Sequence, residues 1–139
     1  MKKYNIGYTT GVYDLFHVGH LNILKQAKSL CEYLIVGVTI DELVSYKAKS
    51  AIIPFEDRLE IIESIKYVDK AVPQASMDKF DAWKKYNFNA MFVGSDWQNT
   101  DKWFAFEKKF SEVDVKVEYF EYTSRISSSI LRDLLLRDN

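Results

Sequence analysis

The chain has 139 residues, of which 47% are hydrophobic and 28% charged, and a formal net charge of −1. This length suits one compact domain, and the composition is that of a globular protein rather than a disordered one. The small net charge argues against a general nucleic-acid binder, and a single cysteine, Cys31, excludes an intrachain disulfide. The N-terminal residues contain no long apolar stretch. We therefore expect neither a signal peptide nor a membrane span, and predict a cytoplasmic protein.

Short apolar runs and helical periodicities alternate along the chain. The first apolar run predicts a strand at 4–10, and an apolar stripe of period 3.6 then predicts a helix at 19–30. A continuous β-rich run at 33–39 is typical of a strand buried on both faces. A second amphipathic pattern predicts a helix at 55–67. The remaining expected elements are a short strand at 68–72, a helix at 77–86, a strand at 90–94, a helix at 102–110, a strand at 115–120 and a helix at 127–137.

This alternation of strands and helices predicts an α/β fold. We expect one domain over residues 1–139, a Rossmann-like doubly wound sheet of about five parallel strands with helices on both faces. Sheets of this kind bind ligands beyond the carboxyl ends of their strands, where the strand order reverses. The residues that directly follow strands are therefore the first candidates for a functional site.

The turn between the first strand and the first helix contains the only two histidines, His17 and His20, with Gly19 just before the second. A helix N-terminus offers unpaired backbone N–H groups and a positive dipole end, and a glycine there lets a ligand approach closely. Imidazole N–H groups in this place can stabilise charge on a phosphorus undergoing displacement. The pattern favours a phosphate site. The alternatives are a helix cap with a buried histidine, and a zinc site, for which the chain supplies few soft ligands.

The segment GVYDLFHVGH at 11–20 resembles the signature G-T-F-D-x-x-H-x-G-H of the cytidylyltransferase-like nucleotidyltransferases. The resemblance continues through most of the chain and is strongest to the bacterial glycerol-3-phosphate cytidylyltransferases. It implies that His17 and His20 contact the triphosphate and stabilise the transition state, and that Asp14 lies near the reacting phosphates and the metal. The same turn would line the nucleotide with Thr10, Gly11, Val12 and Gly19. Val12 stands where the family usually has a threonine.

Basic residues after the second strand also match the family. Lys47 and Lys49 resemble its lysine loop, which covers the phosphates and the acceptor, and Lys47 would take part in catalysis; a solvated loop is the alternative. Arg58 matches an arginine of the acceptor site, and its alternative is an exposed helical arginine paired with a neighbouring carboxylate. Lys66 stands where the family has an arginine with a planar fork of donors.

Two later segments complete the resemblance. Residues 94–97 resemble the family's G-D-D-W, which implies that Gly94 and Asp96 contact the nucleotide and Trp97 the acceptor; Trp97 could instead be a packing residue. Residues 122–129 resemble R-T-E-G-I-S-T-T, whose hydroxyls and amides hold the β- and γ-phosphates, although serine at this point also suits a plain N-cap. There Tyr122 replaces an arginine and Arg125 a glycine. The residues implied here are Thr123, Arg125, Ile126, Ser127 and Ser128.

The resemblance implies a nucleotidyltransferase that transfers CMP from CTP to a small phosphorylated alcohol, glycerol 3-phosphate first, and releases pyrophosphate. The product CDP-glycerol would feed teichoic-acid-type polymers. Mg²⁺ would be held mainly by the nucleotide phosphates, with Asp14 as the protein residue beside it. Relatives are commonly homodimers, so we expect a homodimer, and neither a nucleic acid nor a membrane as partner. Two alternatives stay open: an adenylyltransferase using ATP with FMN or a sugar phosphate, and a non-catalytic nucleotide-binding module.

Overall fold

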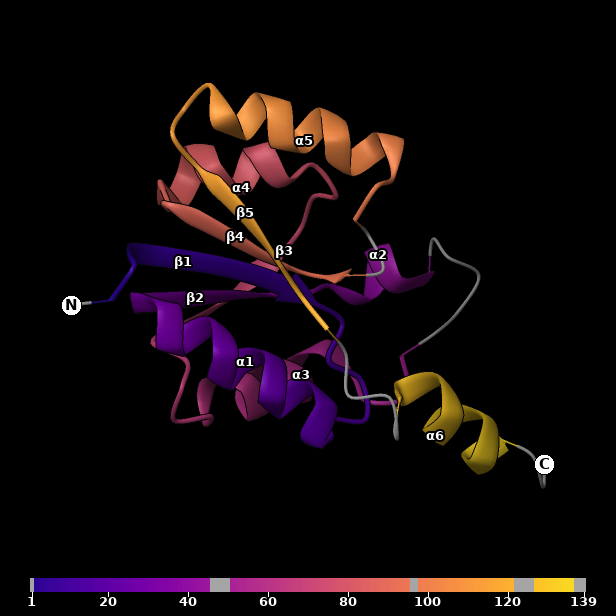
Figure 1. Ribbon diagram of the computed structural model, residues 1–139. Coiled ribbons are helices and arrows are strands. Elements are labelled where there is room, and N and C mark those ends of the chain that lie inside the picture. The colour runs from indigo at the N-terminus through magenta and orange to yellow at the C-terminus, as the bar shows by residue number, and fades with distance from the viewer. Residues whose placement is uncertain (1, 46–50, 96–97, 122–126, 137–139) are drawn as a thin grey trace.

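The computed structural model describes residues 2–45, 51–95, 98–121 and 127–136 (Figure 1). Its five strands form one sheet in the order β3-β2-β1-β4-β5, and every neighbouring pair is parallel. The strand order reverses at β1, which pairs with β2 on one side and β4 on the other. The predicted Rossmann-like α/β fold is thereby confirmed. The strands are β1 (Tyr4–Gly11), β2 (Cys31–Thr39), β3 (Lys70–Gln74), β4 (Ala90–Gly94) and β5 (Lys116–Phe120).

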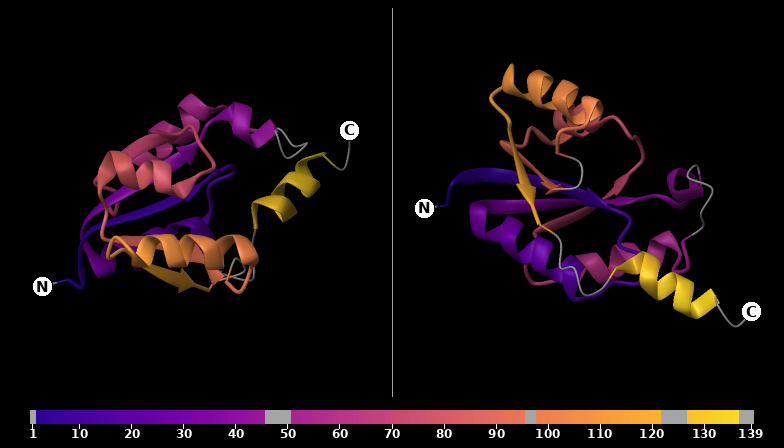
Figure 2. Two further views of the ribbon diagram at one scale, coloured as in Figure 1. Left: turned by 90° about the horizontal axis from the view of Figure 1, so that it is seen from above. Right: turned by 45° about the vertical axis from the view of Figure 1, so that its right-hand side comes forward.

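Helices cover both faces of the sheet. In Figure 1, α1 (Val18–Leu30) and α3 (Phe55–Glu63) lie against one face, while α4 (Lys79–Tyr86) and α5 (Asp101–Ser111) lie against the other. The short α2 (Asp41–Ser45) follows β2 at the carboxyl edge of the sheet. Figure 2 shows α6 (Ser128–Leu136) extending beyond this same edge, away from the body of the molecule. No helix in the described part of the chain is both long enough and apolar enough to span a membrane.

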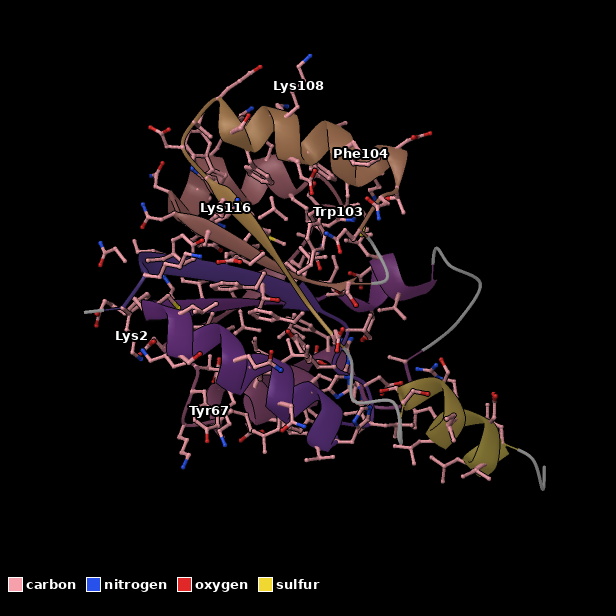
Figure 3. The ribbon with its side chains drawn as sticks, in the orientation of Figure 1. Lys2, Tyr67, Trp103, Phe104, Lys108 and Lys116 are labelled. Carbon is pink, nitrogen blue, oxygen red and sulfur yellow. The ribbon has the colours of Figure 1, made fainter. Side chains whose placement is uncertain are left out.

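The core consists of two apolar layers, one on each face of the sheet. Leu24 of α1 and Ile62 of α3 pack against the β1–β2 side, and both are fully buried. On the opposite face, Phe110 and Trp103 of α5 pack with β4 and its neighbours. Trp103 is 4% exposed whereas the adjacent Phe104 is 51% exposed, and Figure 3 shows the two residues on α5. The sheet is therefore covered on both sides, as its continuous apolar strands require.

Two expected elements differ clearly in position from those observed, and one observed helix was not expected. The helix expected at 55–67 ends at Glu63, where Ser64 forms the C-cap, because the Ser64 N–H turns back to carbonyls of the preceding turn. The strand expected at 68–72 is β3, two residues later, and it includes Pro73. An edge strand tolerates a proline, since one side of its ladder has no partner. The five-residue α2 was not predicted, because one turn is too short to show a periodicity.

Candidate active site

The two histidines form a reciprocal cap at the start of α1. His17 is the N-cap residue, and its Nδ1 accepts the Gly19 N–H at 3.0 Å. In return, Nδ1 of His20 accepts the His17 N–H at 3.3 Å. This is the geometry of a capping box, in which the N-cap and N3 side chains satisfy two of the helix's unpaired N–H groups. The structure therefore shows the helix cap that was one alternative, and it also shows the two histidines at a helix N-terminus, as predicted.

The cap also determines which nitrogen of each ring carries a proton. Because both Nδ1 atoms accept backbone N–H groups, a neutral imidazole must carry its proton on Nε2. The two rings are stacked with centroids 4.1 Å apart, so both present their Nε2–H groups from the same turn. Nε2 of His17 is buried and has no hydrogen-bond partner among the described residues. A buried, unpaired donor at a helix N-terminus is a ready contact for a phosphate oxygen.

Burial keeps both imidazoles uncharged near neutral pH. It lowers the pKa of His17. Burial and then the neighbouring His17 lower the pKa of His20 to about 4, against the opposing effect of Asp14. The two rings therefore act as neutral hydrogen-bond donors rather than as cations.

Asp14 belongs to the same turn as the histidines and is 2% exposed. Its carboxylate accepts N–H groups from Ile52 at 2.8 Å and Ile53 at 2.9 Å, and pairs with Arg132 of α6 at 2.8 Å. Burial by itself would raise the pKa of Asp14, but these three partners together hold the pKa below its ordinary value. The carboxylate is thus ionised and engaged by groups of the chain itself.

The backbone around Asp14 is strained. Tyr13 and Leu15, on either side of it, have φ angles of 57° and 51°, a left-handed conformation that costs roughly 1–2 kcal/mol per residue. The ring of Tyr13 lies so close to Gly11 that a Cβ there would stand 2.9 Å from it. Gly11, expected beside the nucleotide, thus has a packing reason to be glycine. Strain of this kind is common at functional sites because the surrounding structure must hold it.

Arg58 differs from the exposed arginine given as one alternative. Its side chain is fully buried, and its guanidinium donates to the carbonyls of Val12, Ile53 and Thr39 and pairs with Asp41. Four of its five N–H groups are used in this way. The structure shows Arg58 joining the first turn to α2 and α3, and its role in acceptor binding stays a prediction.

The start of α6 brings two serines to the site. Ser127 is the N-cap, because its Oγ accepts the Ile130 N–H at 3.1 Å. The hydroxyl of Ser128 donates to the Asp14 carbonyl at 2.6 Å and lies 3.5 Å from Nε2 of His20. One turn later, Arg132 reaches Asp14. Arg132 was missed in the sequence because only the position of α6 shows that its guanidinium reaches Asp14.

Lys79 is a second residue that the sequence reading missed. It lies in the first turn of α4, is 8% exposed, and places Nζ 3.2 Å from Oγ1 of Thr10. A lysine in the first turn opposes the helix dipole, and this unfavourable position was a signal in the sequence. Thr10, expected beside the nucleotide, thus has a cation next to it at the carboxyl end of β1.

The remaining expected site residues fall into two groups. Val12 and Gly94 are described: the carbonyl of Val12 accepts from Arg58, and Gly94 ends β4 opposite Phe120. The others lie outside the described residues and remain predictions: Lys47, Lys49, Asp96, Trp97, Thr123, Arg125 and Ile126.

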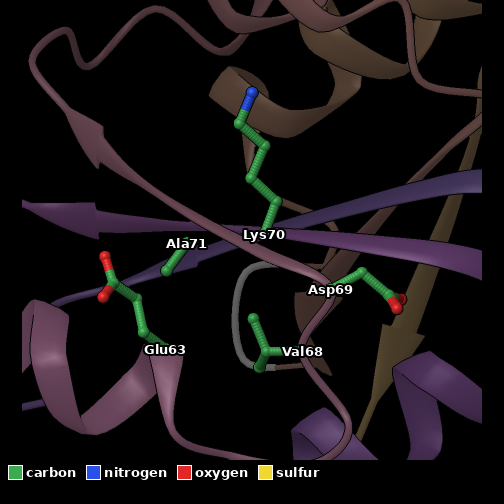
Figure 4. A pocket seen from close by; sticks show the side chains of 5 residues that line it. All are labelled: Glu63, Val68, Asp69, Lys70 and Ala71. Carbon is green, nitrogen blue, oxygen red and sulfur yellow. The ribbon is translucent and has the colours of Figure 1, made fainter.

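A separate surface hollow lies at the opposite edge of the sheet. It is lined by Glu63 at the end of α3, by Val68 and Asp69 just before β3, and by Lys70 and Ala71 at the start of β3 (Figure 4). The Asp69 carboxylate pairs with Lys28 and accepts the Leu34 N–H, so its role is structural. Because parallel strands begin here, the hollow is not part of the crevice at their carboxyl ends.

Comparisons with known proteins identify the family of the chain. Residues 8–134 match the sequence model of the family described as cytidylyltransferase-like. A glycerol-3-phosphate cytidylyltransferase from Staphylococcus aureus is 32% identical over 128 residues, which cover 91% of this chain and 92% of the relative. An FAD synthase from Archaeoglobus fulgidus is 32% identical over 108 residues, which cover 78% of each chain. Among solved structures, the lipopolysaccharide core biosynthesis protein from Thermoplasma volcanium has a TM-score of 0.72 and 26% identity, over 86% of this chain and 97% of its own. The chain therefore belongs to the cytidylyltransferase-like family of nucleotidyltransferases.

Proposed function

We propose that this protein transfers CMP from CTP to a small phosphorylated alcohol, with glycerol 3-phosphate as the acceptor. The observation that carries the proposal is the pair of Nε2–H donors at the N-terminus of α1, one of them buried without a partner among the described residues. The choice of cytidine and glycerol phosphate is supported by the relatives named glycerol-3-phosphate cytidylyltransferase, which match about nine-tenths of this chain.

The reaction needs no covalent enzyme intermediate. A phosphate oxygen of the acceptor attacks the α-phosphorus of CTP in line, forming the new O–P bond. The bond between this phosphorus and the bridging oxygen to the β-phosphate breaks, and pyrophosphate leaves with that electron pair. An ionised phosphate is already a nucleophile, so no general base is required. The site's task is to position the reactants and to stabilise charge on the phosphorus oxygens.

The described residues divide this task between them. The Nε2–H groups of His17 and His20 would donate to phosphate oxygens without being charged themselves. Lys79, next to Thr10, would supply positive charge at the carboxyl end of β1. Mg²⁺ would enter with the triphosphate as part of the substrate. CDP-glycerol formed in this way would serve the synthesis of a glycerol-phosphate polymer.

Pyrophosphate release tests the proposal. The purified protein is supplied with glycerol 3-phosphate and either CTP or ATP, and the same pair of nucleotides is offered with FMN. We expect release with CTP and glycerol 3-phosphate at least tenfold faster than with any other pair. Comparable or faster release with ATP would contradict the assignment of cytidine.

One observation favours a second candidate. The FAD synthase from Archaeoglobus fulgidus is as similar in identity as the Staphylococcus relative, over a somewhat shorter stretch. Release with ATP and FMN in the same assay would support an adenylyltransferase. Binding of nucleotide with no release under any condition would support a non-catalytic module.

A further inference from the structure

Asp14 joins three separate parts of the described chain. Its own turn precedes α1, its carboxylate accepts the N–H groups of Ile52 and Ile53 just before α3, and the same carboxylate pairs with Arg132 on α6. Its carbonyl accepts the hydroxyl of Ser128, also on α6. One buried residue therefore contacts the histidine turn, the segment before α3 and the last helix.

Helix α6 depends on this residue for its position. None of its nine residues is buried, so apolar packing within the described structure does little to fix it. Its hydrogen bonds to distant parts of the described chain end on Asp14, with one long contact from Ser128 to His20. An isolated helix this short is not stable in water, so the contacts at Asp14 decide where it lies.

The environment of Asp14 does not suit a metal ligand. Mg²⁺ requires oxygen ligands at about 2.0–2.1 Å in near-octahedral geometry. One carboxylate oxygen of Asp14 already accepts from Ile52 and Arg132, and the other accepts from Ile53. The guanidinium at 2.8 Å would also repel a divalent cation. Over the described ranges, no group of three or more His, Cys, Asp or Glu side chains could hold a metal either.

We propose that Asp14 is a positioning residue that couples α6 to the Ile52–Ile53 segment and does not ligate the metal. Through Asp14, Ser128 and Arg132 are held at the histidine turn, Ser128 by the backbone carbonyl and Arg132 by the carboxylate, so one residue aligns the parts of the site contributed by opposite ends of the chain. The coupling follows from the contacts alone, and its importance for turnover rests on the proposed function.

Hydrogen exchange of the substrate-free protein tests the coupling. In Asp14→Asn we expect the protection of the Ile52 and Ile53 amides and of the α6 amides to fall together, at least tenfold. The matched control is Asp69→Asn. Like Asp14, Asp69 pairs with a cation, here Lys28, and accepts a backbone N–H, here that of Leu34, but it lies at the opposite edge of the sheet. It should leave both regions protected. Unchanged protection of either region in Asp14→Asn would overturn the proposal.

If Asp14→Asn does not fold, two variants of Arg132 test the same coupling from the side of α6. Arg132→Met should lower protection in α6 at least tenfold while Ile52 and Ile53 stay protected, and Arg132→Lys, which keeps a cation, should restore most of it. Full protection of α6 in Arg132→Met would overturn the proposal.

The metal is tested separately with Mn²⁺, whose free concentration is measured by electron paramagnetic resonance at saturating nucleotide. We expect the affinity of the nucleotide complex for Mn²⁺ to agree within threefold between the wild type and Asp14→Asn. A larger loss would identify Asp14 as a metal ligand and overturn the proposal. If neither CTP nor ATP binds the wild type, the proposed function fails, whereas hydrogen exchange still decides the coupling.

Discussion

One substitution can separate the helix cap that His17 forms from the phosphate contact that we propose for it. In His17→Asn the side chain can still accept the Gly19 N–H as an N-cap, but it has no donor where Nε2–H stood. We expect the free energy of unfolding to stay within about 0.5 kcal/mol of wild type. Turnover should fall roughly 10²–10³-fold, the loss typical of removing one transition-state donor. Urea unfolding and pyrophosphate release measure the two effects.

The alanine variants are the companion experiment. His17→Ala should lose turnover and also about 1 kcal/mol of stability, because the cap is removed. His20→Ala should likewise lose turnover and keep the fold. Near-normal turnover in His17→Asn and His20→Ala would show that neither ring contacts the reacting phosphates.

His20 should make the fold sensitive to acid. Its ordinary pKa of 6.5 is lowered to about 4 in the folded protein, chiefly by burial. Between these pKa values the unfolded chain binds more protons than the folded one. The contribution of neutral His20 to the free energy of unfolding is therefore complete above the ordinary pKa, and it is lost as the pH falls toward the pKa in the folded protein. The shift corresponds to a loss on the order of 3 kcal/mol. Urea unfolding at neutral and acid pH should show a weaker dependence in His20→Gln than in wild type, and equal dependence would contradict this account.

At the scale of elements, Arg58 is the strongest single link. It joins the first turn to α2 and α3 from a fully buried position. Arg58→Met leaves three carbonyls without their donor, and each buried acceptor left unpaired costs about 1–3 kcal/mol, so we expect a loss of about 3–5 kcal/mol in the free energy of unfolding. Asp41 adds little, because its side chain is 44% exposed. The control, Lys66→Met, changes an exposed side chain and should stay within about 0.5 kcal/mol. A small loss in Arg58→Met would show that water replaces the guanidinium.

The strands and most helices could be predicted because each is encoded by its own residues. A continuous apolar run such as the one in β4 needs no distant information. The end of α3 was misplaced because Ile65 continues the apolar stripe after the backbone has left the helix. Arg58 could not be recognised as buried, since its partners Val12 and Asp41 are distant in sequence.

For the site too, the local pattern could be predicted from the sequence and the distant contacts could not. The spacing of His17 and His20 at a helix start indicated phosphate binding, and the structure confirms the helix start. The sequence could not show that each Nδ1 accepts a backbone N–H, because the same two histidines at a helix start could also leave their Nδ1 atoms unpaired. Arg132 joins the site through a tertiary contact alone, whereas the sequence marks Lys79 only by its unfavourable place in the first turn of a helix.

At the scale of the whole molecule, α6 is where we expect two copies to meet. Its exposed apolar residues are Ile130, Leu134, Leu135 and Leu136, each more than half exposed. Leu134→Glu should shift the predicted homodimer toward monomer, because it places a charge in an apolar contact. The control is Phe104→Glu on α5, which is equally exposed and should leave the mass unchanged. Light scattering measures the mass, and a wild type that stays monomeric at all concentrations would contradict the homodimer.

The most direct test of the whole account is a crystal structure of the protein with CTP bound. The predicted result is a phosphate oxygen within about 2.7–3.2 Å of Nε2 of both His17 and His20, with the reciprocal cap intact. Phosphates bound elsewhere, with both Nε2 atoms facing protein groups, would contradict the claim that the start of α1 is the catalytic centre.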